Sequence, residues 1–137
     1  ANVALNAGNY GVVAASGFAN IATNVGSGNL TTGINTVTAQ GVGNVANNLG
    51  GSGNTVQALG GFNRALNLGG TRNNVRAFNQ INLNNPFKLS NFGFNSAFNI
   101  GGKNNTASAG PGPLATAGTI GGDTKTAAQT GPGIKIK

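Results

Sequence analysis

The sequence has no cysteine, histidine, methionine or tryptophan, and it has one acidic residue, Asp123. General acid and base catalysis needs side chains that titrate near neutral pH, and nucleophilic or metal chemistry needs histidine, cysteine or clustered carboxylates. A single carboxylate also excludes paired-carboxylate mechanisms within one chain. We therefore predict that the protein is not an enzyme and has no catalytic residue, metal site or cofactor.

Charged residues are scarce and almost all of one sign. They make up 7% of the chain, against about 25% in ordinary globular proteins. The net charge is +7, and the first 63 residues contain no charged side chain. Low charge favours association between protein molecules.

Long apolar runs and cysteines are both absent. No run of eighteen apolar residues exists, so we predict no membrane-spanning helix. The lack of cysteine excludes a disulfide framework. The chain begins at Ala1 without methionine, as a mature product does after its signal peptide is removed. We therefore expect an extracellular or cell-surface location.

What the sequence does contain is a repeat. Two short phrases alternate from residue 2 to residue 110, and one pair takes about nineteen residues. The first phrase is Asn-x-Ala-x-Asn-apolar-Gly, with the copies NVALNAG, NIATNVG, NVANNLG, NRALNLG and NSAFNIG. The second is Asn-x-Val-x-Ala-x-Gly, with the copies NTVTAQG and NTVQALG and the looser versions GVVAASG, NNVRAFN and NNTASAG.

Each phrase alternates with a period of two residues and ends in glycine, which is typical of a strand closed by a turn. The density of Gly, Asn, Thr and Val disfavours helix. The composition alone would also suit a disordered polar tract, but the periodic placement of apolar residues favours a folded chain. We predict an all-β protein whose residues 1–110 form a two-sided β-solenoid of about five strand-turn-strand rungs.

Three segments depart from the repeat. Residues 27–34 and 80–94 are insertions, and the second contains Pro86, Phe87, Phe92 and Phe94. Its aromatic residues either cover an open flank of the core or contact another molecule. Residues 111–137 contain three prolines, which are excluded from central strands. We predict an irregular C-terminal tail there, whose pieces TKTAAQT and IKIK could add as edge or exchanged strands.

The alternation also indicates which side chains face inward. In the second phrase the core row is Val13, Val37, Val56 and Val75. The first phrase has two solutions, because either its constant Asn-Ala-Asn row or its variable apolar row is buried. A constant row suits stacked asparagine ladders, and it would leave an apolar stripe outside as an association surface. The ladder on this interpretation comprises Asn2, Asn20, Asn24, Asn44, Asn48, Asn63, Asn67, Asn95 and Asn99.

The tandem Asn-x-Ala strand, glycine corner and second alternating strand resemble the curlin repeats of curli, the amyloid fibres of bacterial biofilms. The Asn/Gly-rich phrases are also similar to tandem repeats of mycobacterial surface proteins. The curlin resemblance covers residues 2–110 and implies an extracellular fibre subunit whose rungs continue from one molecule into the next.

The leading functional prediction is a secreted structural subunit that assembles head to tail with itself, because open solenoid ends expose unpaired backbone groups. The alternative is a solenoid that does not polymerise and binds anionic polysaccharide or extracellular DNA. An ice-binding surface would need a regular threonine array, and we expect Thr36 and Thr38 not to continue through the other rungs. The candidate contacts for an anionic partner are Arg64, Arg72, Arg76, Lys88 and Lys103.

Overall fold

The computed structural model describes residues 1–79 and 93–137, and thirteen β-strands make up the regular structure of these residues. The strands form two parallel sheets, which we call sheet A and sheet B. Sheet A contains β1 (Val3–Asn6), β3 (Ile21–Asn24), β5 (Val45–Leu49), β7 (Arg64–Leu68), β9 (Ser96–Ile100), β11 (Ala115–Ile120) and β13 (Gly133–Ile136). Sheet B contains β2 (Gly11–Phe18), β4 (Asn35–Val42), β6 (Thr55–Gly61), β8 (Asn74–Phe78), β10 (Thr106–Ala109) and β12 (Thr126–Gln129).

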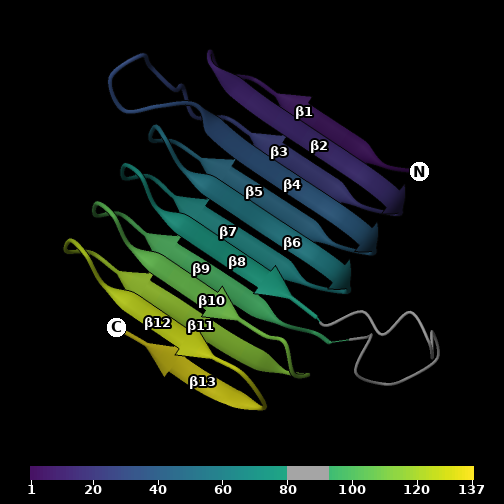
Figure 1. Ribbon diagram of the computed structural model, residues 1–137. Helices are drawn as coiled ribbons and strands as arrows, with labels where there is room; N and C mark the ends of the chain where they lie inside the picture. The colour runs from purple at the N-terminus through teal and green to yellow at the C-terminus, as the bar shows by residue number, and fades with distance from the viewer. Residues whose placement is uncertain (80–92) are drawn as a thin grey trace.

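The chain alternates between the two sheets, so each pair of consecutive strands makes one rung (Figure 1). Each strand pairs in parallel with the strand two places along the chain, and equivalent phrase positions lie opposite each other, as in Val37 with Val56. The N-terminus and C-terminus lie at opposite ends of the stack (Figure 1). The predicted all-β, two-sided solenoid is therefore confirmed, and every copy of both phrases forms a strand.

Glycines form the sharp corners between the sheets. Gly41, at the end of the second phrase, has a φ of +115°. Residues with a Cβ atom rarely adopt this backbone conformation. A Cβ atom at this position would also collide with the carbonyl oxygen of Gly60 in the next rung. The corner therefore needs glycine both for its backbone angle and for the close approach of successive rungs.

The predicted irregular tail is wrong, but the prediction that TKTAAQT and IKIK add as edge strands is confirmed, because β12 and β13 are the edge strands of sheets B and A. Strand β11 pairs with β9, β12 pairs with β10, and β13 pairs with β11, all in parallel and in register. The stack thus continues beyond residue 110 for one further rung and a final strand. Pro111, Pro113 and Pro132 lie in the corners before β11 and β13, where proline removes no ladder hydrogen bond.

The first insertion lies between β3 and β4, and the second falls in the sequence between β8 and β9. Within residues 27–34, Asn29 and Gly33 form an antiparallel bridge, and Leu30 is 90% exposed at the tip. Most of the second insertion, including Pro86, Phe87, Lys88 and Phe92, lies outside the described residues. Of its aromatic residues, Phe94 is described, and its ring stacks on that of Phe62 with centroids 5.4 Å apart.

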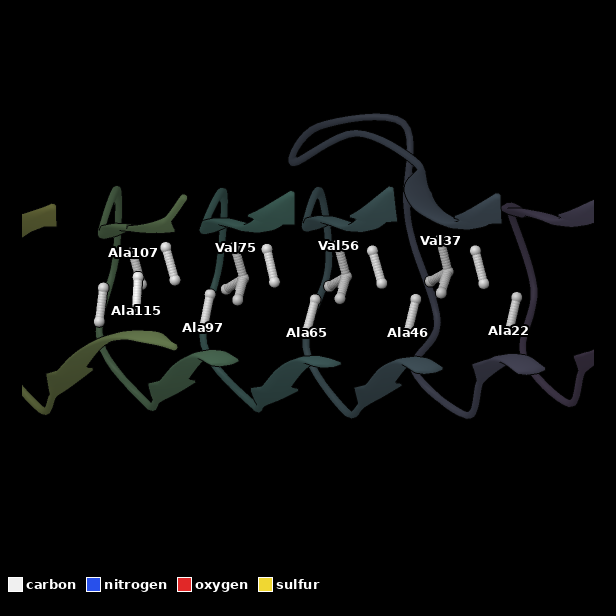
Figure 2. Packing of buried hydrophobic residues seen from close by; sticks show 14 of the residues in the cluster. Ala22, Val37, Ala46, Val56, Ala65, Val75, Ala97, Ala107 and Ala115 are labelled. Atoms are coloured by element: carbon white, nitrogen blue, oxygen red, sulfur yellow. The ribbon is translucent and has the colours of Figure 1, made fainter. Parts of the chain in front are cut away.

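A thin core of alanine and valine separates the two sheets. Figure 2 shows Val37, Val56 and Val75 of sheet B pointing toward Ala46, Ala65 and Ala97 of sheet A. All six side chains are fully buried. Val13 packs against this cluster but is only partly buried, because β2 is an edge strand. Three residues of the predicted valine row, Val37, Val56 and Val75, are therefore confirmed as core, and Val13 lies at the edge of that core.

Candidate assembly surfaces

Asparagine, and not a large apolar residue, fills the rest of the interior. Asn20, Asn24, Asn44, Asn48, Asn63, Asn67, Asn95 and Asn99 are each at most 1% exposed. Asn2 is exposed because it belongs to the edge rung of β1. The structure therefore places the constant row of the first phrase inside and its apolar row outside.

Ladder one runs through Asn2, Asn20, Asn44, Asn63 and Asn95. Each Oδ1 accepts a hydrogen bond from the backbone N–H of the next member, at 3.0 to 3.2 Å. The Nδ2 group of Asn20 donates to the carbonyl oxygens of Ser16 and Gly41 at 2.6 and 2.7 Å. Ladder one therefore ties each corner of the chain to the rung that follows.

Ladder two runs through Asn6, Asn24, Asn48, Asn67 and Asn99. Here the amides bond to one another, with each Nδ2 donating to the Oδ1 of the preceding rung at 2.7 to 2.8 Å. The hydroxyl of Thr119 donates to Asn99 Oδ1 at 2.6 Å and ends the series. Identical side chains stacked in this way form the asparagine ladder known from cross-β structures.

Ladder three was not among the predicted ladder residues. It comprises the buried residues Asn35, Asn54, Asn73 and Asn105, which begin the second phrase or lie beside its first position. Each Oδ1 accepts the backbone N–H of the next member, and that of Asn105 accepts the N–H of Lys125. The recurring asparagine at the start of the second phrase was the sequence signal for this ladder.

The ladders leave no free polar group for a ligand in the interior. Within the described ranges, every buried side-chain nitrogen and oxygen has a hydrogen-bond partner. A buried amide without a partner would be costly, so satisfied ladders stabilise the stack. Candidate functional groups must therefore be sought on the outer faces, the corners and the edges.

The outer face of sheet A is mainly apolar, and its uncharged polar positions are Thr23, Asn47, Ser96 and Thr116. One continuous column, which we call the aliphatic row, consists of Val25, Leu49, Leu68, Ile100 and Ile120 in register. Beside it lie further exposed apolar side chains, including Val3, Leu5 and Ile21 at one end and Ile134 and Ile136 at the other. On the strands of sheet A, Arg64 is the one outward-facing charged residue.

The outer face of sheet B is more polar than that of sheet A, although Val12, Phe18 and Val42 are exposed on its strands β2 and β4. Thr36 lies opposite Thr55, and Thr106 opposite Thr126, with Asn74 between these pairs.

Thr36 and Thr38 were expected not to continue through the other rungs. This is confirmed for Thr38, which lies between Ala14 and Gln57. It is only partly right for Thr36, because its column contains Thr55 on the next rung but is broken by Val12 on one side and Asn74 on the other. A single column interrupted by asparagine is not the regular threonine array that ice binding requires.

The predicted contacts for an anionic partner do not form one patch. Arg64 lies on the outer face of sheet A, and Arg76 lies on that of sheet B, where its guanidinium is 4.7 Å from the ring centroid of Phe78. Arg72 and Lys103 lie together at one corner, and Lys88 is outside the described residues. Two of the five residues are thus brought to one place.

That corner is a shallow depression lined by Thr32, Thr71, Arg72, Lys103 and Asn104. Its geometry follows from the stack, because the backbone of Thr71 bridges to Lys103 in the next rung, and Lys103 bridges to Asp123. Arg72 donates to the carbonyl oxygen of Thr31 at 3.1 Å. The carboxylate of Asp123 accepts the backbone N–H of Lys103 at 2.8 Å, which reduces the positive potential at one end.

Comparisons of the chain with protein-family models, curated proteins and solved structures gave no match. The resemblance to curlin repeats consequently stays a prediction. In residues 1–79 and 93–137 no helix has the length and apolar character needed to cross a membrane.

Proposed function

We propose that this chain is a secreted structural subunit that associates with copies of itself in an extracellular matrix or at a cell surface. The observation that carries the proposal is the outer face of sheet A, where one charged residue stands among rows of exposed aliphatic side chains. Contiguous exposed apolar patches of several hundred square ångströms mark interaction sites. The face fits association and offers no group for chemistry.

The outer face of sheet A is large enough for an interface between two copies of the chain. Seven strands about 4.8 Å apart, each with about five residues, cover about 34 Å by 16 Å, or about 500 Å² per molecule. Two such faces in contact bury about 1,000 Å², the lower limit for a specific interface. Sheets packed face to face in sandwiches show the same arrangement at a separation of about 10 Å.

A second copy fits the face better than a lipid surface does. Interfacial lipid binding uses Trp, Tyr, Lys and Arg around an apolar surface, and the strands of sheet A present only Arg64 of these residues on their outer side. Arg64 is the first residue of β7, so its side chain can extend from the rim of a paired face into water. A twofold axis would bring the two aliphatic rows into one interface.

Sedimentation velocity over a range of protein concentrations tests the proposal, together with negative-stain microscopy of the same samples. We expect reversible association that high salt does not weaken, because apolar contact and not charge drives it. A monomer at every concentration would refute the proposal. Long filaments would indicate head-to-tail joining through the edge strands, which the repeats predicted.

A second candidate function, binding of an anionic polysaccharide or extracellular DNA, is favoured by the corner that Arg72 and Lys103 share. Such a site would act through non-specific charge contacts, because the remaining lining groups are threonine and asparagine. Lys103 is in register with Thr71, the residue before Arg72, so the two cations lie on adjacent rungs, offset by one residue along the chain.

The double variant Arg72→Ala with Lys103→Ala is expected to weaken binding to DNA or heparin and to lower the slope of log affinity against log salt by about 2. The matched control is Arg64→Ala with Arg76→Ala, which removes the same charge from two other surfaces. Equal losses in both variants would mean that net charge, and not this corner, binds the polymer.

A further inference from the structure

Strand β13 carries a lysine in the column that forms the alanine core of sheet A. Register places Ala22, Ala46, Ala65, Ala97, Ala117 and Lys135 one above another. The five alanines are fully buried. Lys135 is exposed because β13 is the edge strand of sheet A, but its position in the strand is that of an inward-facing residue.

We propose that β13 is a charged edge that prevents another copy of the chain from stacking on this end of the solenoid. If a second copy continued sheet A in register, its β1 would pair with β13 and its Ala4 would lie next to Lys135, since Ala4 belongs to the same core column. The ammonium group would then lie in the inward column between Ala117 and Ala4 of the second copy. Because sheet B has one strand fewer than sheet A, no described strand of sheet B lies opposite β13 to offer the ammonium group a partner. Inward-pointing charges are a known protection of edge strands against pairing.

The one side-chain carboxylate of the chain lies at a corner and outside the core column that holds Lys135. Asp123 is the one acidic residue of the sequence, and it lies at the corner, where it accepts the N–H of Lys103. An amine buried without a counter-ion is strongly unfavourable. Stacking on β13 therefore requires that the charge be removed, or that a different partner brings an acidic side chain.

The asparagine ladders end on the same side of the molecule. After Asn95, ladder one is continued by Ala115 and then Gly133, and after Asn99, ladder two is continued by Thr119 and then Lys137. None of these four residues has a side-chain amide oxygen. Asn2 and Asn6 of an arriving copy would consequently find no Oδ1 acceptor, although each later member of their ladders has one.

The opposite edge has no such feature. Strands β1 and β2 contain no charged side chain, and their inward positions hold Ala4, Asn6, Val13 and Ala15, of which Asn6 accepts a hydrogen bond from Asn24. The stack thus has two unlike edges, one compatible with a neighbouring rung and one that opposes it. This inference concerns the ends of the solenoid and is independent of pairing through the outer face of sheet A.

The parent chain for the test carries Leu49→Lys, which suppresses pairing through the outer face of sheet A. Three variants of this parent are compared with it, and they carry Lys135→Ala, Lys135→Arg or Arg76→Ala. Lys135→Ala restores the alanine column, and we expect end-to-end species in sedimentation and microscopy at a concentration at least tenfold lower than for the parent. Lys135→Arg keeps the charge and should behave as the parent does. Arg76→Ala loses the same charge from the outer face of sheet B and should also match the parent.

Circular dichroism of each variant checks that the fold is kept, which the exposed position of Lys135 favours. The inference is overturned if Lys135→Ala assembles no more readily than the parent chain. It is equally overturned if Arg76→Ala promotes assembly as much as Lys135→Ala, since net charge would then explain both. If the wild-type chain does not pair through the outer face of sheet A, this comparison is still valid, because every chain in it carries Leu49→Lys and none depends on that pairing.

Discussion

Asn48→Asp is expected to destabilise the folded chain by about 3 to 5 kcal/mol near neutral pH, the cost of a buried charge without a partner. Asn48 is fully buried. Its Nδ2 donates to Asn24 Oδ1, and its Oδ1 accepts from Asn67 Nδ2, both at 2.7 Å. Aspartate has the same shape but no N–H, so a charged oxygen would face the oxygen of Asn24 across a hydrogen-bond distance.

The destabilisation of this variant should depend on pH in a defined direction. Burial and the facing oxygen both disfavour the charged form, so they raise the pKa of the new carboxyl above its unfolded value of about 3.9. The folded state then binds the proton more tightly than the unfolded state. Stability is therefore lost as pH rises from the unfolded pKa to the folded pKa of this carboxyl, and it is regained as pH falls. The protonated acid can donate to Asn24 Oδ1 and restore the ladder.

Asn74→Asp is the matched control, because Asn74 is an exposed asparagine of β8 on the outer face of sheet B, away from the proposed interface. A surface change of this kind should alter the free energy of unfolding by no more than about 0.5 kcal/mol. Urea denaturation followed by circular dichroism, near neutral pH and near pH 3, measures both variants. Equal stabilities for the two variants at both pH values would contradict the ladder described here.

Leu49→Lys is expected to weaken self-association at least about 100-fold, which corresponds to about 2.7 kcal/mol. Leu49 lies within the aliphatic row, between Val25 and Leu68. A twofold pair would contain the substitution twice, so two ammonium groups would enter one apolar interface without counter-ions. The residue is 43% exposed in the single chain, so the fold itself should tolerate lysine.

Thr38→Lys adds the same charge to the outer face of sheet B, where Thr38 lies between Ala14 and Gln57. We expect this control to associate as the wild-type chain does. Sedimentation equilibrium of the three proteins gives the dissociation constants directly. If both lysine variants dissociate to the same extent, repulsion between net charges explains the loss, and the outer face of sheet A is not the interface.

The strands could be predicted from the sequence because each phrase combines a two-residue alternation with a closing glycine. The choice of buried row in the first phrase was open, because transfer energies favour burying Leu66 or Phe98 over Asn67. Stacking decided it, since an amide in a ladder finds its partners in identical residues of the neighbouring rungs. Positional identity carried more information than hydrophobicity.

The last rung could not be predicted from the phrases, because its corners contain proline and its strands lack the asparagines of the earlier copies. Ile120-Gly121-Gly122 repeats the corner of Leu49-Gly50-Gly51, and Ala117 keeps the alanine of the core column. Proline was correctly excluded from the strands, but the corners accept it. Asparagine could be replaced there because Ala115 donates its backbone N–H and Thr119 its hydroxyl to the ladder below.

The surface on which each basic residue lies could not be predicted from the sequence. Arg64, Arg72 and Arg76 are close in sequence, yet they lie on sheet A, at a corner and on sheet B. Their faces depend on the register of each strand and on the length of each corner. Lys135 shows the same limit, since its inward position is defined only by pairing of β13 with β11.

Every strand pairs only with its counterparts in the rungs on either side, and this gives the molecule a nearest-neighbour cooperativity. In such a linear array, stability is a sum of rung and interface contributions, and loss of structure begins at the ends. An interior rung has neighbours on both sides, whereas β1 and β13 each have one partner strand in sheet A. The chain should therefore fray inward from its edges, so the strands best placed to meet another molecule are also the least firmly held.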